Sequence, residues 1–319
     1  MIGTRSLPLL LLILLGLLVA NLMFGAVSLP FKHIIEGFQV GNANYFTVHE
    51  YRFPRTILAM VVGAMMALAG ALVQGVIRNP LASPDVLGVS HGAGLAAVFY
   101  MTFFPSADIG WLPAVALIGS LIAALMLWWL CGRHSSTIKL AITGVALAAL
   151  YASCVDFLML VKPLEINNAL LWLTGSLWGR GWNQLAMLLP WLLLIPCALW
   201  LAKPLNLIHL GDDSAISLGV KASTLRLVSL AIAVGLTASC VAICGPIGFL
   251  GLVAPHLTRK LVGGRHQLLL PSTMLVGAIL LLLADLTART IDPPIELPAG
   301  IMTAIIGAPY FLWLLFRTK

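Results

Sequence analysis

The chain has 319 residues, of which 61% are hydrophobic and only 9% are charged, and its formal net charge is +7. Soluble domains carry roughly 25% charged residues, so this composition excludes a water-soluble globular protein. Apolar stretches of roughly 20 residues are typical of helices that cross a membrane. The composition therefore predicts an integral membrane protein. Its basic residues lie in short loops, where they orient helices, and no nucleic-acid partner is expected.

Ten apolar stretches follow one another along the chain. They cover residues 6–27, 55–77, 88–105, 111–131, 138–160, 184–202, 225–244, 247–262, 268–290 and 298–316. The first is longer than the apolar core of a cleavable signal peptide, so we interpret it as a retained helix. A segment at 167–178 is too short to span and is typical of a re-entrant or surface helix. The pattern predicts an all-α polytopic membrane protein with about ten transmembrane helices in a single domain, 1–319.

The distribution of basic residues predicts the orientation. If the N-terminus is cytoplasmic, twelve of the 18 Lys and Arg residues fall on the inner side and the other six on the outer side. Cytoplasmic loops carry the excess of Lys and Arg in such proteins. We therefore expect both termini inside the cell.

The chain carries none of the short motifs of nucleotide-hydrolysing or proteolytic enzymes. No Gly-x-x-x-x-Gly-Lys-Ser/Thr phosphate loop is present, so we expect no ATP hydrolysis by this route. An ion-coupled carrier would depend on intramembrane acids, and only Asp156 and Asp285 qualify. Asp285 precedes Arg289 by four residues, which predicts a helical ion pair. An ion-coupled transporter and a membrane-embedded enzyme stay as alternatives, the latter without any recognisable catalytic set.

A polar segment interrupts the apolar pattern at residues 205–220. Gly211 precedes Asp212, and acidic residues stabilise the first turn of a helix, whereas Gly219 is typical of a residue just after a helix end. We predict a short cytoplasmic helix, within a segment of about residues 203–224, that a partner outside the membrane grips. A helix lying on lipid is the alternative. The predicted contact residues are Leu210, Gly211, Asp212, Asp213, Ala215, Leu218 and Gly219, with Ile216 as a further apolar contact.

Three parts of the chain together resemble one family. They are YRFPRT at 51–56, RNPLASPDVLGVSHGAG at 78–94, and the C-terminal third with GFLGLVAPH at 248–256, ADLTAR at 284–289, ELPAG at 296–300 and GAP at 307–309. The set resembles the FecCD family, the permease subunits of ABC importers for iron–siderophores, haem and cobalamin. Within the family the similarity points to ferric dicitrate permeases, through HEYR at 49–52, NALLWLTGSLWGR at 168–180 and PPIELP at 293–298.

The resemblance implies the architecture of the cobalamin-importer permease, a type II ABC importer, in a bacterial inner membrane. It implies a non-catalytic, multi-pass subunit that moves an iron(III) chelate, ferric dicitrate, with another siderophore, haem or cobalamin as alternatives. The implied partners are a second permease (a sister chain or a copy), two cytoplasmic ATPase subunits, a periplasmic substrate-binding protein and membrane lipid. No cofactor or metal is expected on this chain, because ATP and Mg would sit on the ATPase.

The resemblance also assigns roles to particular residues, and some of these roles have a plainer alternative. Arg52, Arg55 and Arg289 would receive carboxylates of the binding protein, which Arg pairs bidentately, or would anchor helices at the interface. Residues 203–224 would couple to the ATPase. Ser136 and Thr137 would form a cytoplasmic gate, or an ordinary solvated turn. The implied pathway-lining residues are Gly144, Ala148, Ser153, Gly175 and Ser176.

Overall fold

The computed structural model describes residues 6–132, 137–162, 166–209 and 211–317. In the first half, the α-helices are α1 Ser6–Met23, α2 Phe31–Glu36, α3 Phe53–Ile77, α4 Val89–Phe103, α5 Leu112–Cys131, α6 Thr137–Val161 and α7 Ile166–Leu173. In the second half they are α8 Trp182–Leu188, α9 Leu194–Trp200, α10 Ala202–Ile208, α11 Asp212–Ser217, α12 Ala222–Cys244, α13 Leu250–Val262, α14 His266–Thr290 and α15 Ala299–Arg317. Shorter helical turns are η1 Phe46–Arg52, η2 Pro84–Leu87, η3 Ile109–Trp111 and η5 Leu189–Leu193.

The predicted all-α polytopic class is confirmed, and each of the ten apolar stretches coincides with a helical segment. Seven segments of the described chain are long and apolar enough to cross a membrane. The sixth stretch is assembled from α8, η5 and α9, because Pro190 lies in the first turn of η5 and tightens the helix there. Helix α13 has only 13 residues, about 20 Å at 1.5 Å per residue, which is shorter than the hydrocarbon core of a bilayer.

Helices α3, α12 and α14 form the centre of the bundle, while α1 and α6 lie at its exposed periphery. Small residues bring the central helices together. A Cβ on Gly63 of α3 would lie 2.4 Å from the carbonyl oxygen of Gly277 on α14. A Cβ on Gly70 would overlap the backbone of Gly251 on α13 in the same way. Since lipid is as apolar as the helix surfaces, such close backbone approach is a main source of helix association in a membrane.

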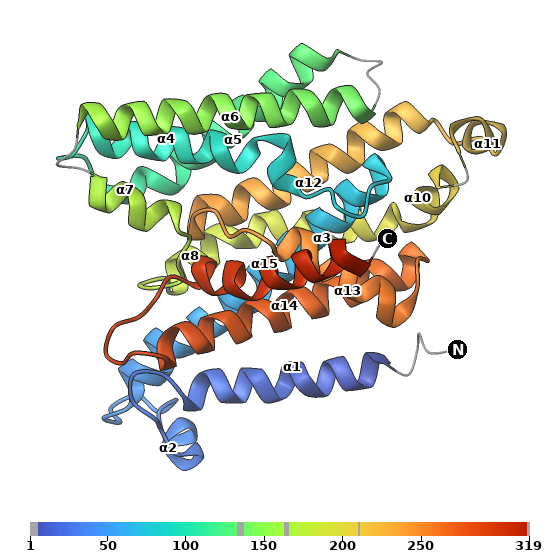
Figure 1. The fold of residues 1–319 in the computed structure, drawn as a ribbon. Helices are drawn as coiled ribbons and strands as arrows, with labels where there is room; N and C mark the ends of the chain where they lie inside the picture. Colours follow the sequence, from blue (N-terminus) through green and yellow to red (C-terminus); the bar gives the residue numbers. More distant parts are fainter. Residues whose placement is uncertain (1–5, 133–136, 163–165, 210, 318–319) are drawn as a thin grey trace.

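The two ends of the bundle differ in what they carry. In Figure 1, α1 begins and α15 ends at the same end, on the right of the view, where α10 and α11 also lie. Helix α2 lies at the opposite end. Both ends of the described chain thus share one side with the predicted coupling segment, as the charge distribution requires.

Candidate functional site

The short helix predicted in the polar segment exists, with the predicted ends, and its coupling role stays a prediction. Helix α11 runs from Asp212 to Ser217 and follows Gly211, whose φ is +111°. It ends in a Schellman motif: the N–H of Gly219 donates to Ile216 O (2.9 Å) and the N–H of Val220 donates to Ala215 O (2.9 Å). Gly219 has a φ of +82°, a left-handed conformation that favours glycine. Leu210 lies outside the described residues.

The two faces of α11 have different environments. Ala215 is fully buried in the hydrophobic core, whereas Ile216 and Leu218 are exposed. Ala215 therefore faces its own chain, and its expected contact with a partner is wrong for a physical reason: the helix uses this small residue to pack inward. Beside the exposed face lies a hollow of about 440 Å³, lined by Ile216, residues 219–224 and Arg226. The apolar side chains and the hollow together form a surface suited to a protein partner.

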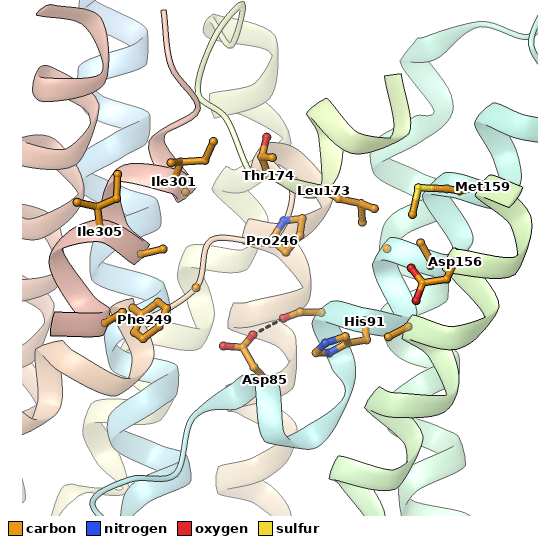
Figure 2. A pocket seen from close by; sticks show the side chains of 18 of the residues that line it. Asp85, His91, Asp156, Met159, Leu173, Thr174, Pro246, Phe249, Ile301 and Ile305 are labelled. Atoms are coloured by element: carbon orange, nitrogen blue, oxygen red, sulfur yellow. Dashed lines mark hydrogen bonds between the residues drawn. The ribbon is translucent and has the colours of Figure 1, made fainter. Parts of the chain in front are cut away.

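A cavity of about 930 Å³ opens in the middle of the bundle (Figure 2). Its walls come from η2 and the start of α4, from α6, from the end of α7, from the loop before α13 and from α15. The lining residues are Asp85, Ser90, His91, Gly94, Ala152, Val155, Asp156, Met159, Leu173, Thr174, Pro246, Gly248, Phe249, Gly300, Ile301, Ala304, Ile305, Ala308 and Pro309. Most of them are apolar or small, so the cavity offers a smooth wall with few polar contacts.

The polar groups of the cavity gather where η2 meets α4. Ser90 Oγ donates a hydrogen bond of 2.8 Å to Asp85 Oδ1. The neighbouring His91 has a buried Nδ1 without a hydrogen-bond partner among the described residues. Figure 2 shows the side chains of Asp85 and His91 beside the cavity, together with that of Asp156 on α6. Among the described residues that line the cavity there is no Lys or Arg, so the cavity has no cation to hold a carboxylate ligand.

The pathway positions expected on α6 lie beside the cavity and are not among its described lining residues. Gly144 and Ala148 share a helix face with Ala152, which does line it, because residues four apart lie on one side. Closer to the helix start, however, this face packs on η2: a Cβ on Gly144 would lie 2.0 Å from Val86 O. Ser153 is exposed on a different face. Gly144 thus packs against η2, and the cavity opens further along the same face at Ala152. A pathway role for Ala148 and Ser153 stays a prediction.

The expected pathway positions after α7 serve a tight turn. Gly175 has a φ of +67°, and a Cβ on it would lie 2.2 Å from Pro246 O. The N–H of Ser176 donates to Cys244 O at 2.7 Å. This turn thus binds α7 to the end of α12, and Thr174, one residue earlier, faces the cavity. Of the predicted gate, Ser136 lies outside the described residues, as does the side chain of Thr137.

The three outer arginines form a buried ion cluster. Arg52, Arg55 and Arg289 expose 4%, 1% and 1% of their surface. Arg55 donates to Asp285 Oδ1 from Nη2 (2.8 Å) and Nε (3.1 Å), and it also pairs with Glu296. The cluster therefore links α3, α14 and the segment before α15. The predicted helical pair is confirmed, because Arg289 Nε lies 3.2 Å from Asp285 Oδ2.

The same arginines bind the N-terminal helix. Arg289 Nη2 donates to Asn21 Oδ1 at 2.6 Å. Arg52 donates to the carbonyl oxygens of Leu22 (2.8 Å) and Met23 (3.0 Å), at the end of α1. The guanidinium groups of all three arginines are thus already bound within the chain. The sequence showed no sign that these side chains are buried. Docking of a partner at these arginines stays a prediction.

Comparison with known proteins agrees with the geometry. The FecCD transport family matches residues 11–317. The chain is 48% identical over 305 residues to the Fe(3+) dicitrate transport system permease protein FecD of Escherichia coli (strain K12), covering 95% of this chain and 96% of that protein. It is 49% identical over 272 residues to the Fe(3+)-citrate import system permease protein YfmE of Bacillus subtilis (strain 168), covering 85% and 82%.

A solved structure has the same fold. An inward-facing conformation of a metal-chelate type ABC transporter superimposes with a TM-score of 0.89 at 34% identity, covering 98% of this chain and 99% of that one. The chain is a multi-pass membrane permease, and it belongs to the FecCD transport family.

Proposed function

We propose that this chain is the membrane-spanning subunit of a binding-protein-dependent ABC importer that carries ferric citrate across the bacterial inner membrane. The observation that carries the proposal is the similarity to two permeases named for ferric citrate, from two different bacteria, at 48% and 49% identity over 95% and 85% of this chain. Identity to the hydroxamate permease FhuG of Bacillus subtilis is lower, at 38%. Citrate is therefore the favoured ligand of the iron.

The cavity supports passage of such a chelate. Its volume of about 930 Å³ lies at the upper end of small-molecule pockets. A citrate chelate presents carboxylates, and the cavity presents Asp85 and Asp156 with no basic residue among its described lining. Like charges disfavour tight binding, so the chelate would be released and not stored. A second permease, a sister chain or a copy, would complete the wall beside α6 and α15.

The energy would come from other chains. We assign the exposed Ile216 and Leu218, with the hollow of about 440 Å³ beside them, as the contact to one of two cytoplasmic ATPase subunits. Apolar side chains next to a concavity are the usual core of a protein interface. ATP and Mg would bind those subunits, and this chain would contribute no cofactor and no catalytic residue. Ser136 and Thr137 keep their proposed role as the cytoplasmic gate.

The outer ion cluster supports docking of an acidic partner, in a modified form. Arg55 and Arg289 pair with Asp285 and Glu296, whereas Arg52 binds backbone carbonyls. The charge of Arg52, which no carboxylate pairs among the described residues, would attract a carboxylate of a periplasmic binding protein. Arg52, Arg55 and Arg289 would then act through the field they create, since their side chains are bound within the chain.

Uptake by cells tests the cargo. The chain would be expressed with its binding protein, ATPase and partner permease in a strain that lacks its own ferric citrate importer. We expect uptake of radioactive iron supplied as the citrate chelate, and none above background for iron supplied as a hydroxamate chelate or as haem. Uptake of haem or of the hydroxamate chelate in place of citrate would overturn the assignment.

A further inference from the structure

The first turn of α14 is capped by a residue from another helix. The residue before α14, Arg265, makes no side-chain cap. Instead, Asn206 of α10 supplies its Oδ1, which accepts from the backbone N–H of His266 at 3.0 Å. A free N–H at a helix start needs such a partner. Asn206 thus caps α14, a role that usually belongs to the residue just before the helix, although it lies 60 residues earlier in the sequence.

Asn206 makes two further bonds to the same helix start. Its Oδ1 also lies 2.8 Å from His266 Nδ1, and its Nδ2 donates to Gln267 Oε1 at 2.7 Å. Because a carbonyl oxygen can only accept, His266 must carry its proton on Nδ1. Three hydrogen bonds therefore join one side chain of α10 to the first two residues of α14.

The joint is half-buried, since Asn206 is partly exposed and Gln267 is exposed, and it also includes α3. His266 is 1% exposed, and Leu205 and Ile208 of α10 are fully buried beside it. A Cβ on Gly75 of α3 would lie 3.1 Å from His266 Nε2. Helix α10 is thereby fixed to the core, whereas α11 projects beyond it at the end of the bundle, as Figure 1 shows. A displacement of α11 can reach the body of the protein through α10, and also through α12, which α11 contacts.

Helix α14 connects this joint to the outer ion cluster. It has 25 residues, about 37 Å at 1.5 Å per residue. The backbones of α14 and α3 are in direct contact where Gly277 meets Gly63. Near its outer end, Asp285 and Arg289 bind Arg55 of α3 and Asn21 of α1. One continuous helix thus contacts the coupling segment at one end and the outer cluster at the other.

We propose that Asn206 is a positioning residue that transmits the movement of the coupling segment into α14, and through α14 to the outer ion cluster. The inference rests on the proposed function, in which α11 contacts an ATPase. Helix α10 cannot shift against α14 without breaking three hydrogen bonds, so the two move as one body. Leu205 and Ile208 supply contact area, but apolar contacts are non-directional and allow sliding that the hydrogen bonds of Asn206 prevent.

The test uses the complete importer in lipid nanodiscs, with wild-type, Asn206→Ala and Asn206→Asp chains. ATP hydrolysis is measured with and without loaded binding protein, and uptake is measured in proteoliposomes. For Asn206→Ala we expect normal co-purification of the ATPase and basal hydrolysis within about twofold of wild type. Stimulation by the binding protein and uptake should both fall about 5- to 10-fold, in the range of coupling between distant sites. Asn206→Asp keeps the acceptor for His266 and should restore most of both.

Asn42→Ala is the matched control. Its Oδ1 also accepts from a backbone N–H, that of Asn44 at 2.9 Å, but the bond stays within one loop, so stimulation and uptake should be unchanged. The inference is overturned if Asn206→Ala keeps full stimulation and uptake, if basal and stimulated hydrolysis fall in parallel, or if Asn206→Asp is as impaired as Asn206→Ala. The wild-type chain is measured first. If it neither binds the ATPase nor responds to the binding protein, the proposed function fails, independently of the Asn206 variants.

Discussion

Replacing Asp285 by Ala should strongly destabilise the protein. Asp285 is fully buried and faces two guanidiniums, those of Arg55 at 2.8 Å and Arg289 at 3.2 Å. Both arginines are 1% exposed, so neither can reach water to compensate. Removing one partner of a buried ion pair costs about 3–5 kcal/mol, because it leaves an uncompensated charge. Arg55 keeps its pair with Glu296, whereas Arg289 keeps only the neutral Asn21, so the expected loss lies within that range and not above it.

The assay is the free energy of unfolding in mixed detergent and SDS micelles. The control is Glu36→Ala, which removes a carboxylate from an exposed helical pair: Lys32 Nζ lies 3.8 Å from Glu36 Oε1, with side chains 82% and 38% exposed. Exposed pairs of this kind contribute about 0.3–0.5 kcal/mol. Equal small losses for the two variants would refute the reasoning, since they would mean that the buried arginines find other partners or water.

Three further predictions follow from the packing, the coupling helix and one histidine. Gly277→Val should lower the free energy of unfolding by about 1–3 kcal/mol, because a Cβ there would lie 2.3 Å from Ala67 Cβ; an unchanged unfolding curve would contradict the close packing. Ile216→Asp should abolish co-purification of the ATPase while Ser214→Ala, an exposed change on the same helix, should not. Partial desolvation lowers the pKa of His209, whose side chain is otherwise exposed, and Arg259 and Arg78 lower it further; its small contribution to stability is therefore complete above about pH 6.5 and falls as the pH drops below it. His209→Gln should reduce this acid sensitivity in unfolding midpoints measured from about pH 7.5 to 5; an unchanged profile would assign it to other groups.

The membrane fold was accessible to sequence reasoning because its signals are local. A run of apolar residues needs no partner to be recognised, and all ten expected stretches are helical in the structure. The ends of α11 were equally predictable, since Gly211 and Gly219 carry the positive φ values on which those ends depend. The pair between Asp285 and Arg289 followed from their spacing of four residues.

The surroundings of the candidate site residues were harder to predict, because they depend on contacts between residues far apart in the sequence. Arg55 and Asp285 are 230 residues apart in sequence, so nothing local revealed that an arginine expected at the surface is buried. Gly144 has the small side chain expected of a pathway, but η2 occupies the space beside it. Asn206 gave no signal of its own, since its partners come 60 residues later.

One measurement tests the central claim most directly: uptake of iron as the citrate chelate into proteoliposomes that contain the purified importer. The account predicts uptake only when the binding protein is outside and ATP is inside, and its loss with Ile216→Asp in this chain. Uptake by this chain alone, driven by an ion gradient without ATP or ATPase, would contradict the account and would identify an ion-coupled carrier.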